Sequence, residues 1–349
     1  MDEGEGAYAM KIAMYYGPED VRIEERPSPV PGAGEIVVQN RVTLTCGTDV
    51  KTFFRGHPYW TPPAPFGHES AGVVIAAGEG APFAVGDRVV AHNSAPCGTC
   101  YFCKQGQHSL CDRLTFNLGA FAEIQKIPAV IVSQNTFLIP PEVSCKDAAL
   151  TEPFACALYG IEQSEIKLGD TVVVNGAGPI GLMLIRLAVL RGARVIATDL
   201  HPMRLELARK LGAAVTIDIR DVSDQVQAVK AYTEEERGAD VAIEAAGFPE
   251  LWEKTVAMVR KGGIATLFGG PKPGTTVTFD TKLLHYSQIT IKGVFHTTPR
   301  HVKAAFDLIC RGVISAVDFV NEEYRLQEIE QAIRTHAQGL AIKNAIVYP

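Results

Sequence analysis

Four cysteines lie close enough together in the sequence to surround a single metal ion. They follow the spacing C-x2-C-x2-C-x7-C in a segment that also contains Gly98 and Gly106, and they are Cys97, Cys100, Cys103 and Cys111. Four thiolates with no vacant position form a closed, tetrahedral zinc site of the structural type. An iron–sulfur cluster is the alternative, because sets of four cysteines also hold such clusters.

A second set of ligand-type residues is dispersed. Cys46 precedes Gly47-Thr48-Asp49, His68 and Glu69 are adjacent, and Glu152 precedes a proline. Taken singly, each residue has an ordinary interpretation, such as core packing or the start of a helix. Together, a cysteine, a histidine and a carboxylate that leave one position for water or substrate describe a catalytic zinc. The third ligand remains a choice between Glu69 and Glu152.

A glycine-rich loop of the form G-x-G-x-x-G lies between a strand-like run at 171–175 and a helical pattern that begins near Ile180. Such a loop brings its backbone close to a pyrophosphate at the start of a helix. The predicted cofactor-binding residues are Gly176, Gly178, Pro179, Ile180, Gly181, Asp199 and Arg204. The alternative is a glycine-rich turn that binds another nucleotide or none.

The choice of dinucleotide depends on Asp199, which ends the next strand-like run, eighteen residues after Gly181. A carboxylate there binds the ribose hydroxyls of NAD and repels the 2′-phosphate of NADP. We therefore expect NAD, while Arg204 keeps NADP as the alternative.

The length of the chain and a change in its sequence pattern predict two domains, which must position the metal-ligand and cofactor-binding residues. A chain of 349 residues is too long for one ordinary hydrophobic core. The first 150 residues contain short β-like runs separated by Gly and Pro, whereas strand-like and helical patterns alternate from about Leu168. That alternation predicts a doubly wound parallel sheet. We expect one domain at 1–158 and 295–349 and another at 159–294; within the latter, 251–260 has helical spacing.

Charge and composition argue against several classes of partner. The net charge is -6 without a dense basic tract, which disfavours nucleic acid and anionic membranes. The apolar stretch 172–190 is interrupted by Asn175, Pro179 and Arg186, so it reads as a strand, a turn and a helix. The N-terminus lacks a secretory pattern, and clustered cysteines indicate metal binding rather than disulfides. We therefore expect a cytoplasmic protein.

In their order along the chain, these motifs resemble the zinc-containing medium-chain dehydrogenases, close to the sorbitol (polyol) and threonine branches. The resemblance implies an α/β architecture: a GroES-like β-rich catalytic domain and a Rossmann cofactor domain. It also implies a zinc-activated alcohol that passes a hydride to NAD. Zinc is then preferred for the four cysteines too, because hydride transfer needs no one-electron chemistry, and two zinc ions per chain are expected.

The resemblance also assigns roles to individual residues. Cys46, His68 and either Glu69 or Glu152 would bind the catalytic zinc, and Asp49 would orient His68. Thr48 would bind the substrate hydroxyl and pass on its proton. Many relatives have a histidine where this chain has Lys51, which would bind a substrate hydroxyl or lie solvated at the edge of the cleft.

The substrate is less determined by the sequence. Candidate pocket residues form a polar, partly cationic set: Phe54, His57, Phe116, Asn117, His296 and Arg300. Such a lining suits a polyol, cyclitol or sugar alcohol, including a phosphorylated or acidic one; threonine and simple alcohols are alternatives. The full set of zinc ligands disfavours a non-catalytic NAD(P)H-binding structural or sensor protein. Cys46, His68 and Asp199 together disfavour a zinc-free NADPH-dependent quinone or enoyl reductase. The resemblance implies a homo-oligomer, a dimer or tetramer.

Overall fold

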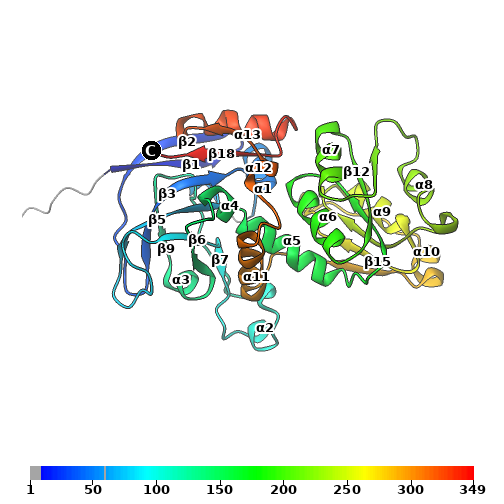
Figure 1. The fold of residues 1–349 in the computed structure, drawn as a ribbon, viewed down its shortest axis with the longest axis horizontal. Helices are drawn as coiled ribbons and strands as arrows, with labels where there is room; N and C mark the ends of the chain where they lie inside the picture. The colour runs from blue at the N-terminus through cyan, green and yellow to red at the C-terminus, as the bar shows by residue number, and fades with distance from the viewer. Residues whose placement is uncertain (1–8, 59) are drawn as a thin grey trace, which may run out of the picture. The chain divides into compact units, whose positions relative to one another are not determined.

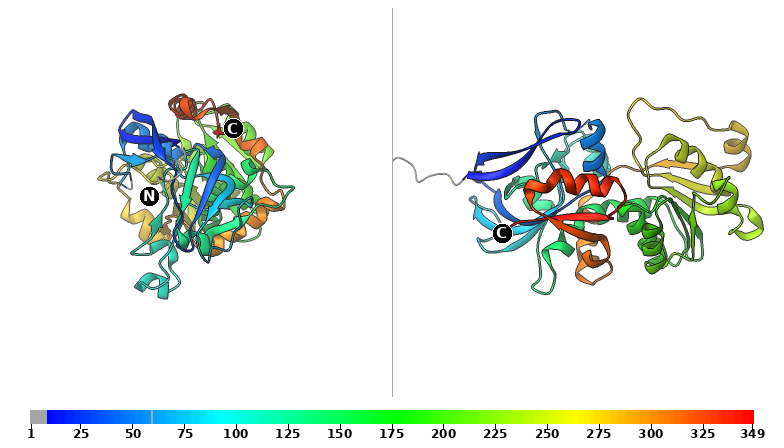
Figure 2. Two further views of the ribbon diagram at one scale, coloured as in Figure 1. Left: turned by 90° about the vertical axis from the view of Figure 1, so that its left-hand side faces the viewer. Right: turned by 90° about the horizontal axis from the view of Figure 1, so that it is seen from above.

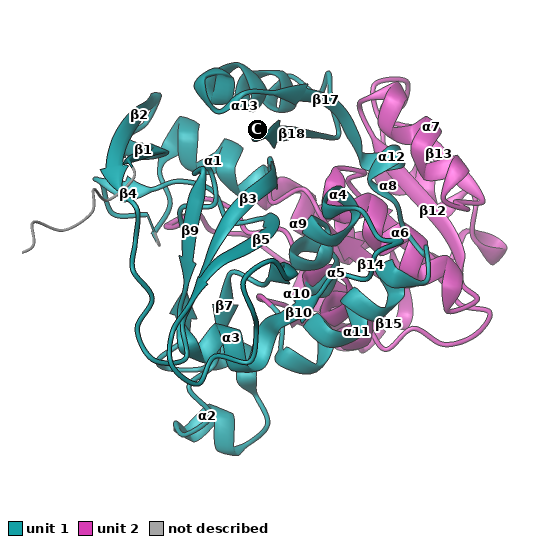
Figure 3. Cartoon of the chain, turned by 60° about the vertical axis from the view of Figure 1, so that its left-hand side comes forward, with its two compact units in different colours: residues 1–155, 297–349 teal, residues 156–296 magenta. Residues whose placement is uncertain are grey.

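The chain folds into two compact units, described here by a computed structural model that covers residues 9–58 and 60–349 (Figure 1). Unit 1 comprises residues 1–155 and 297–349, and unit 2 comprises residues 156–296 (Figure 3). The chain passes from unit 1 to unit 2 within helix α5 (Thr151–Gln163). Unit 1 is therefore built from two separate stretches of sequence.

Unit 1 is rich in β-structure. A small antiparallel sheet has the order β2-β1-β4, and a larger sheet has the order β10-β6-β5-β3-β18-β17, with β9 paired to β3. Their bounds are β1 Ala9–Gly17, β2 Asp20–Pro27, β3 Ile36–Leu44, β4 Ala64–Pro65, β5 Ser70–Ala77, β6 Arg88–Ala91, β9 Ile124–Ile127, β10 Thr136–Leu138, β17 Val320–Tyr324 and β18 Lys343–Val347. The C-terminal strand β18 thus lies between β3 and β17 (Figure 2).

Helices of unit 1 cover these sheets and connect the strands. They are α1 (Gly47–Arg55), α2 (Tyr101–Lys104), α3 (Ala129–Asn135), α4 (Cys145–Ala149), α11 (Pro299–Cys310), α12 (Ala316–Phe319) and α13 (Ile329–Ala337). Helix α13 buries Ile329, Ala332 and Ile333, which follow the i, i+3, i+4 spacing of one helix face. These side chains join a core that includes Phe53 of α1. Helix α13 therefore fixes α1 against the C-terminal part of the sheet.

Unit 2 is a parallel sheet with the strand order β13-β12-β11-β14-β15-β16. Its strands are β11 (Thr171–Asn175), β12 (Arg194–Asp199), β13 (Val215–Asp218), β14 (Ala239–Glu244), β15 (Val259–Leu267) and β16 (Thr290–Gly293). Its helices are α6 (Pro179–Leu190), α7 (Pro202–Lys210), α8 (Gln225–Lys230), α9 (Pro249–Met258) and α10 (Thr281–Ser287). Strand order runs outward from β11 and β14 in opposite directions, which is the doubly wound arrangement. The predicted fold class is confirmed.

One predicted boundary was wrong. The helical spacing over 251–260 suggested a helix to Arg260, whereas α9 ends at Met258 and β15 begins at Val259. Val259 pairs with Ala239 and joins the buried core of unit 2, so sheet pairing overrides the helical pattern there. The apolar stretch 172–190 forms β11 and α6 as expected. Across the described residues there is no helix both long and apolar enough to cross a membrane.

Candidate active site and metal centres

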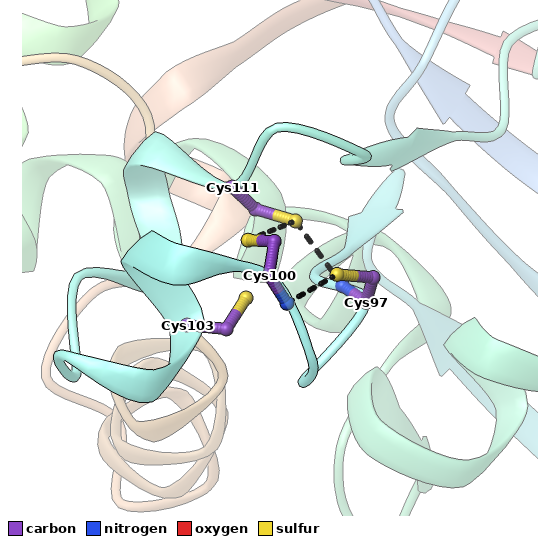
Figure 4. Close-up of side chains that lie close together, drawn as sticks. All are labelled: Cys97, Cys100, Cys103 and Cys111. Carbon is purple, nitrogen blue, oxygen red and sulfur yellow. Dashed lines mark hydrogen bonds between the residues drawn. The ribbon is translucent and has the colours of Figure 1, made fainter.

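The four clustered cysteines converge in one loop of unit 1. This loop follows β7 (Ser94–Ala95), includes α2 and the short helix His108–Leu110, and ends before β8 (Thr115–Phe116). Figure 4 shows the four side chains directed toward a common centre, and their sulfur atoms all lie within 4.8 Å of one another. Sulfurs bound to a tetrahedral zinc at about 2.3 Å are about 3.8 Å apart. The Sγ atoms of Cys100 and Cys111 are 3.8 Å apart, so the cluster fits a zinc ion.

Backbone N–H groups of the same loop point at the sulfurs. The amide of Cys97 donates to Sγ of Cys111 at 3.3 Å, and that of Cys100 donates to Sγ of Cys97 at 3.4 Å. The amide and guanidinium of Arg113 also donate to Sγ atoms, of Cys111 and Cys97 respectively. Donors of this kind favour thiolates, and the backbone N–H of Thr99 is the main group that lowers the pKa of Cys97 to about 5.

The dispersed ligand set also comes together in unit 1. Cys46 caps the N-terminus of α1, while His68 and Glu69 directly precede β5. The sulfur of Cys46, a ring nitrogen of His68 and a carboxylate oxygen of Glu69 all lie within 4.8 Å of one another, and all three residues are buried. A thiolate, an imidazole and a carboxylate form the donor set of a catalytic zinc that keeps an open position. The second site therefore also fits a zinc ion.

Asp49 links two members of this cluster. One carboxylate oxygen of Asp49 accepts a hydrogen bond from the backbone N–H of Cys46 at 2.9 Å, and the other lies 2.9 Å from Nδ1 of His68. Because Nδ1 faces Asp49, Nε2 is the ring nitrogen available to a metal. Burial opposes a charge on His68, but Asp49 and Cys46 outweigh burial and raise its pKa well above the usual value.

Glu69 has a partner that sequence reasoning missed. Its carboxylate oxygens lie 2.9 and 2.7 Å from Nζ of Lys343, and both side chains are completely buried. Burial raises the pKa of Glu69, and the ammonium of Lys343 opposes that shift. The signal in the sequence is weak, because Lys343 is the first residue of the short strand β18 and 274 residues separate the two partners.

Glu152 lies in the first turn of α5, and His92 faces it. The Nε2 atom of His92 is 3.8 Å from Oε1 of Glu152. The backbone N–H of Ser94 donates to Nδ1 of His92, so the ring proton belongs on Nε2, the nitrogen facing Glu152. Burial raises the pKa of Glu152 to about 7. The group of mutually close ligand atoms around Cys46 contains Glu69 and not Glu152.

The other predicted residues of unit 1 are distributed around this cluster. Thr48 and Lys51 lie on α1 directly after Cys46, and the amide of Thr48 donates to Sγ of Cys46 at 3.5 Å. His57 packs edge-on against Trp60, which in turn packs against the ring of His68. Sequence reasoning did not single out Trp60.

The remaining pocket candidates lie on several different elements. Phe54 lies near the exposed end of α1, and Phe116 ends β8. The amide of Asn117 donates to the carbonyl of Asn93 at 2.7 Å. His296 adopts a left-handed backbone conformation with φ of 65°, and Arg300 is exposed in the first turn of α11. The substrate pocket stays a prediction.

The glycine loop of unit 2 joins β11 to α6, which begins at Pro179 with Gly178 as its N-cap. A Cβ on Gly181 would lie 1.9 Å from the carbonyl oxygen of Gly176, so only glycine permits this contact between helix and strand. The first amides of α6 have no partner within the helix and can bind a phosphate.

The carboxylate of Asp199 is held beside this loop. One oxygen accepts from the amide of Ala177 at 2.7 Å, and the other accepts from Leu200 and His201 at 2.8 and 2.9 Å. The guanidinium of Arg204 is 3.9 Å from the first of these oxygens. The arrangement fixes a negative charge where the ribose of a dinucleotide lies in folds of this kind.

Comparisons with known proteins bear on both units. Residues 32–137 match the sequence profile of the alcohol dehydrogenase GroES-like domain, and residues 179–311 match that of the zinc-binding dehydrogenases. A sorbitol dehydrogenase of Bacillus subtilis is 32% identical over 354 residues, covering 97% of each chain. An erythritol/L-threitol dehydrogenase of Mycolicibacterium smegmatis is 32% identical over 352 residues, covering 95% of each chain.

Solved structures of dehydrogenases are also similar to this chain. A zinc-binding dehydrogenase fold from Sinorhizobium meliloti 1021, solved with NADP bound, superposes with a TM-score of 0.89. It is 29% identical in sequence, and the match covers 98% of this chain and 100% of that one. A 2R,3R-butanediol dehydrogenase from Bacillus subtilis superposes with a TM-score of 0.86 at 27% identity, over 97% of this chain and 100% of that one.

Proposed function

The chain belongs to the zinc-containing medium-chain polyol dehydrogenases, and we propose that it transfers a hydride between NAD and a secondary alcohol of a polyol, cyclitol or sugar alcohol. The observation that carries this proposal is the convergence of Cys46, His68 and Glu69 within 4.8 Å in a buried part of unit 1. A zinc ion held there supplies a Lewis acid that lowers the pKa of a substrate hydroxyl.

The residues of the cluster have separate tasks in this proposal. Cys46 and His68 would hold the ion, and Asp49 fixes the ring of His68 through Nδ1, which leaves Nε2 as the nitrogen available to bind it. Glu69 is the third ligand, because its oxygen belongs to the close group around Cys46 and that of Glu152 does not. Glu152, whose pKa burial raises to about 7, is suited to hold a proton near neutral pH.

Helix α1 provides the proposed contacts to the substrate. Thr48 lies in its first turn, where its amide donates to the sulfur of Cys46, and its hydroxyl would accept a hydrogen bond from the substrate alcohol. Lys51 follows three residues later and therefore lies on the same face of the helix. We assign to Lys51 a hydrogen bond to a second hydroxyl, which a polyol has and a simple alcohol lacks.

NAD is the proposed cofactor, with the glycine loop at its pyrophosphate. Three backbone amides fix the carboxylate of Asp199, which would repel a 2′-phosphate. Arg204 lies close by, and the related Sinorhizobium meliloti protein was solved with NADP, which makes NADP the competing cofactor. Turnover with each cofactor at equal concentration tests the preference for NAD, and faster turnover with NADP would refute it.

The central test replaces Cys46 or His68 by Ala. Each variant is expected to lose one of two zinc ions and all measurable polyol oxidation while still binding NADH, because unit 2 is untouched. Cys310→Ala is the matched control, since Cys310 is a half-buried free thiol on α11 of the same unit. Retained turnover in Cys46→Ala would contradict the proposal.

A substrate panel tests the chemical class. Sugar alcohols, cyclitols, tetritols, threonine and monoalcohols should be compared by kcat/KM under the same conditions. The proposal expects the highest values for compounds with vicinal hydroxyls. Exclusive use of short monoalcohols would rule out the polyol assignment and leave the metal assignment in place.

A further inference from the structure

Lys343 is a buried charged residue that the proposed mechanism does not use. It opens strand β18, and its side chain and that of Glu69 are each 0% exposed. Lysine is almost never fully buried unless it is paired, because desolvating an ammonium is costly. The pairing with Glu69 is close, since both carboxylate oxygens lie within 2.9 Å of Nζ.

The backbone around the pair leaves it little freedom. The amide of Asn344 donates to Oγ1 of Thr45, and the amide of Thr45 donates to the carbonyl of Asn344, both at 2.9 Å. Thr45 precedes Cys46, and the amide of Leu44 donates to the carbonyl of Glu69 at 2.9 Å. The segments that carry the cysteine, the glutamate and the lysine are therefore joined directly by hydrogen bonds.

Glu69 thus stands between two cations when the cluster holds a metal ion. One cation is the ammonium of Lys343, which contacts both carboxylate oxygens. The other is the ion bound by Cys46 and His68, whose ligand atoms lie within 4.8 Å of an oxygen of Glu69. A carboxylate that shares its charge with a buried ammonium is a weaker metal ligand than one that has no other cation nearby.

We propose that Lys343 is a positioning residue for the metal centre: its buried ammonium competes with the bound ion for the carboxylate of Glu69 and keeps that ligand exchangeable. The proposal rests on the proposed function, because it requires the ion at Cys46 and His68. It gives the C-terminal strand a defined role at a site whose other members lie in the first 69 residues.

Replacing Lys343 by Met removes the competing charge at similar length. Glu69 then has the metal as its only nearby cation, so the ion should be held more tightly. Release of the ion to a chelator should slow by about tenfold or more, in the range that neighbours of metal ligands usually control. Lys343→Arg keeps the charge, and its planar fork can engage both oxygens, so release should be at least as fast as in the unmodified protein.

The experiment uses the full-length protein with Co²⁺ in the catalytic site and zinc retained at the four cysteines. The visible absorption of Co²⁺ depends on its ligands and geometry, so it reports the metal environment independently of turnover. Loss of this absorption after addition of dipicolinate gives the release rate. Lys343→Met should change the spectrum and slow the loss, whereas Lys126→Met, which removes a surface lysine paired with Glu35, should do neither.

A double-variant cycle separates positioning from a general structural role. In a Glu69→Gln background, Lys343→Met should leave the release rate unchanged, because no carboxylate remains to be shared. Equal slowing in both backgrounds, or no slowing in either, would overturn the inference. If Lys343→Met does not fold, Lys343→Arg still tests the inference. Slower release of Co²⁺ from Lys343→Arg than from the unmodified protein would contradict competition by the charge of residue 343.

Failure of the proposed function would give a different result. Cys46→Ala should abolish the Co²⁺ spectrum of the catalytic site, and an undiminished spectrum would overturn the metal assignment itself. If Cys46→Ala abolishes the spectrum and Lys343→Met alters neither spectrum nor release, only the role of Lys343 is refuted.

Discussion

Gly181 offers the sharpest test of how the cofactor loop is built. A Cβ at this position would lie 1.9 Å from the carbonyl oxygen of Gly176, and real Cβ contacts do not fall below 3.0 Å. Gly181→Ala therefore forces α6 and the end of β11 apart by about 1.1 Å, the difference between the two distances. Overpacking of this kind costs about 1–3 kcal/mol, and we expect unit 2 to lose that much stability.

Gly178 provides the matched control in the same loop. A Cβ there meets no atom within 4 Å, and its φ of -65° is ordinary for any residue. Gly178→Ala should leave the stability of the cofactor-free protein unchanged to within about 0.5 kcal/mol. Both variants should bind NADH more weakly, the first because the loop is distorted and the second because a methyl group stands at the approach to the pyrophosphate.

The assay can report on unit 2 alone. The chain has two tryptophans, and Trp252 lies on α9 with its indole N–H bonded to Glu244 and to the carbonyl of Gly269. In a Trp60→Phe background, urea unfolding followed by fluorescence therefore monitors unit 2. A Gly181→Ala protein as stable as Gly178→Ala would refute the close-contact argument.

Three further predictions concern the metal centres and the cofactor. Cys111→Ser should reduce bound zinc from two ions to one per chain without abolishing NADH binding. Native mass spectrometry of this variant measures its zinc content, and two ions per chain would refute the four-cysteine site. Asp49→Asn should weaken catalytic zinc binding by about 10–100-fold, measured by competition with a chelator. Asp199→Asn keeps an acceptor for the amides of Leu200 and His201 but removes the charge. It should reduce any preference for NAD over NADP by about tenfold, or about 1.4 kcal/mol. An unaltered ratio of kcat/KM for the two cofactors would show that Asp199 does not determine cofactor preference.

The parts of the protein that were predictable from sequence are those whose residues lie close together along the chain. The four cysteines occupy one loop, and the glycine loop is one strand–turn–helix connection, so spacing alone specifies which atoms meet. The parallel sheet was predictable as well, because its strands are buried on both faces and appear as continuous apolar runs such as 172–174.

The proposal of Glu69 rather than Glu152 as the third ligand depends on long-range packing. Glu69 immediately follows His68, but Glu152 reaches the same region only through the placement of α5. Lys343 was missed for a related reason, since a lysine in a short terminal strand is ordinarily assigned to the surface. Only its pairing with Glu69 across the sheet reveals a buried role.

The two metal centres therefore depend on the fold in different ways. All ligands of the four-cysteine site lie within fifteen residues, so a single loop can form it before the sheet is complete. The cluster that we propose to bind the catalytic zinc contains Cys46, His68 and Glu69, and Glu69 pairs with Lys343 of β18. This pairing forms only once β18 has paired with β3. The return of the chain to unit 1 thus does more than close a sheet. It brings the buried ammonium of Lys343 to Glu69, which ties the charge of the proposed catalytic site to completion of the fold.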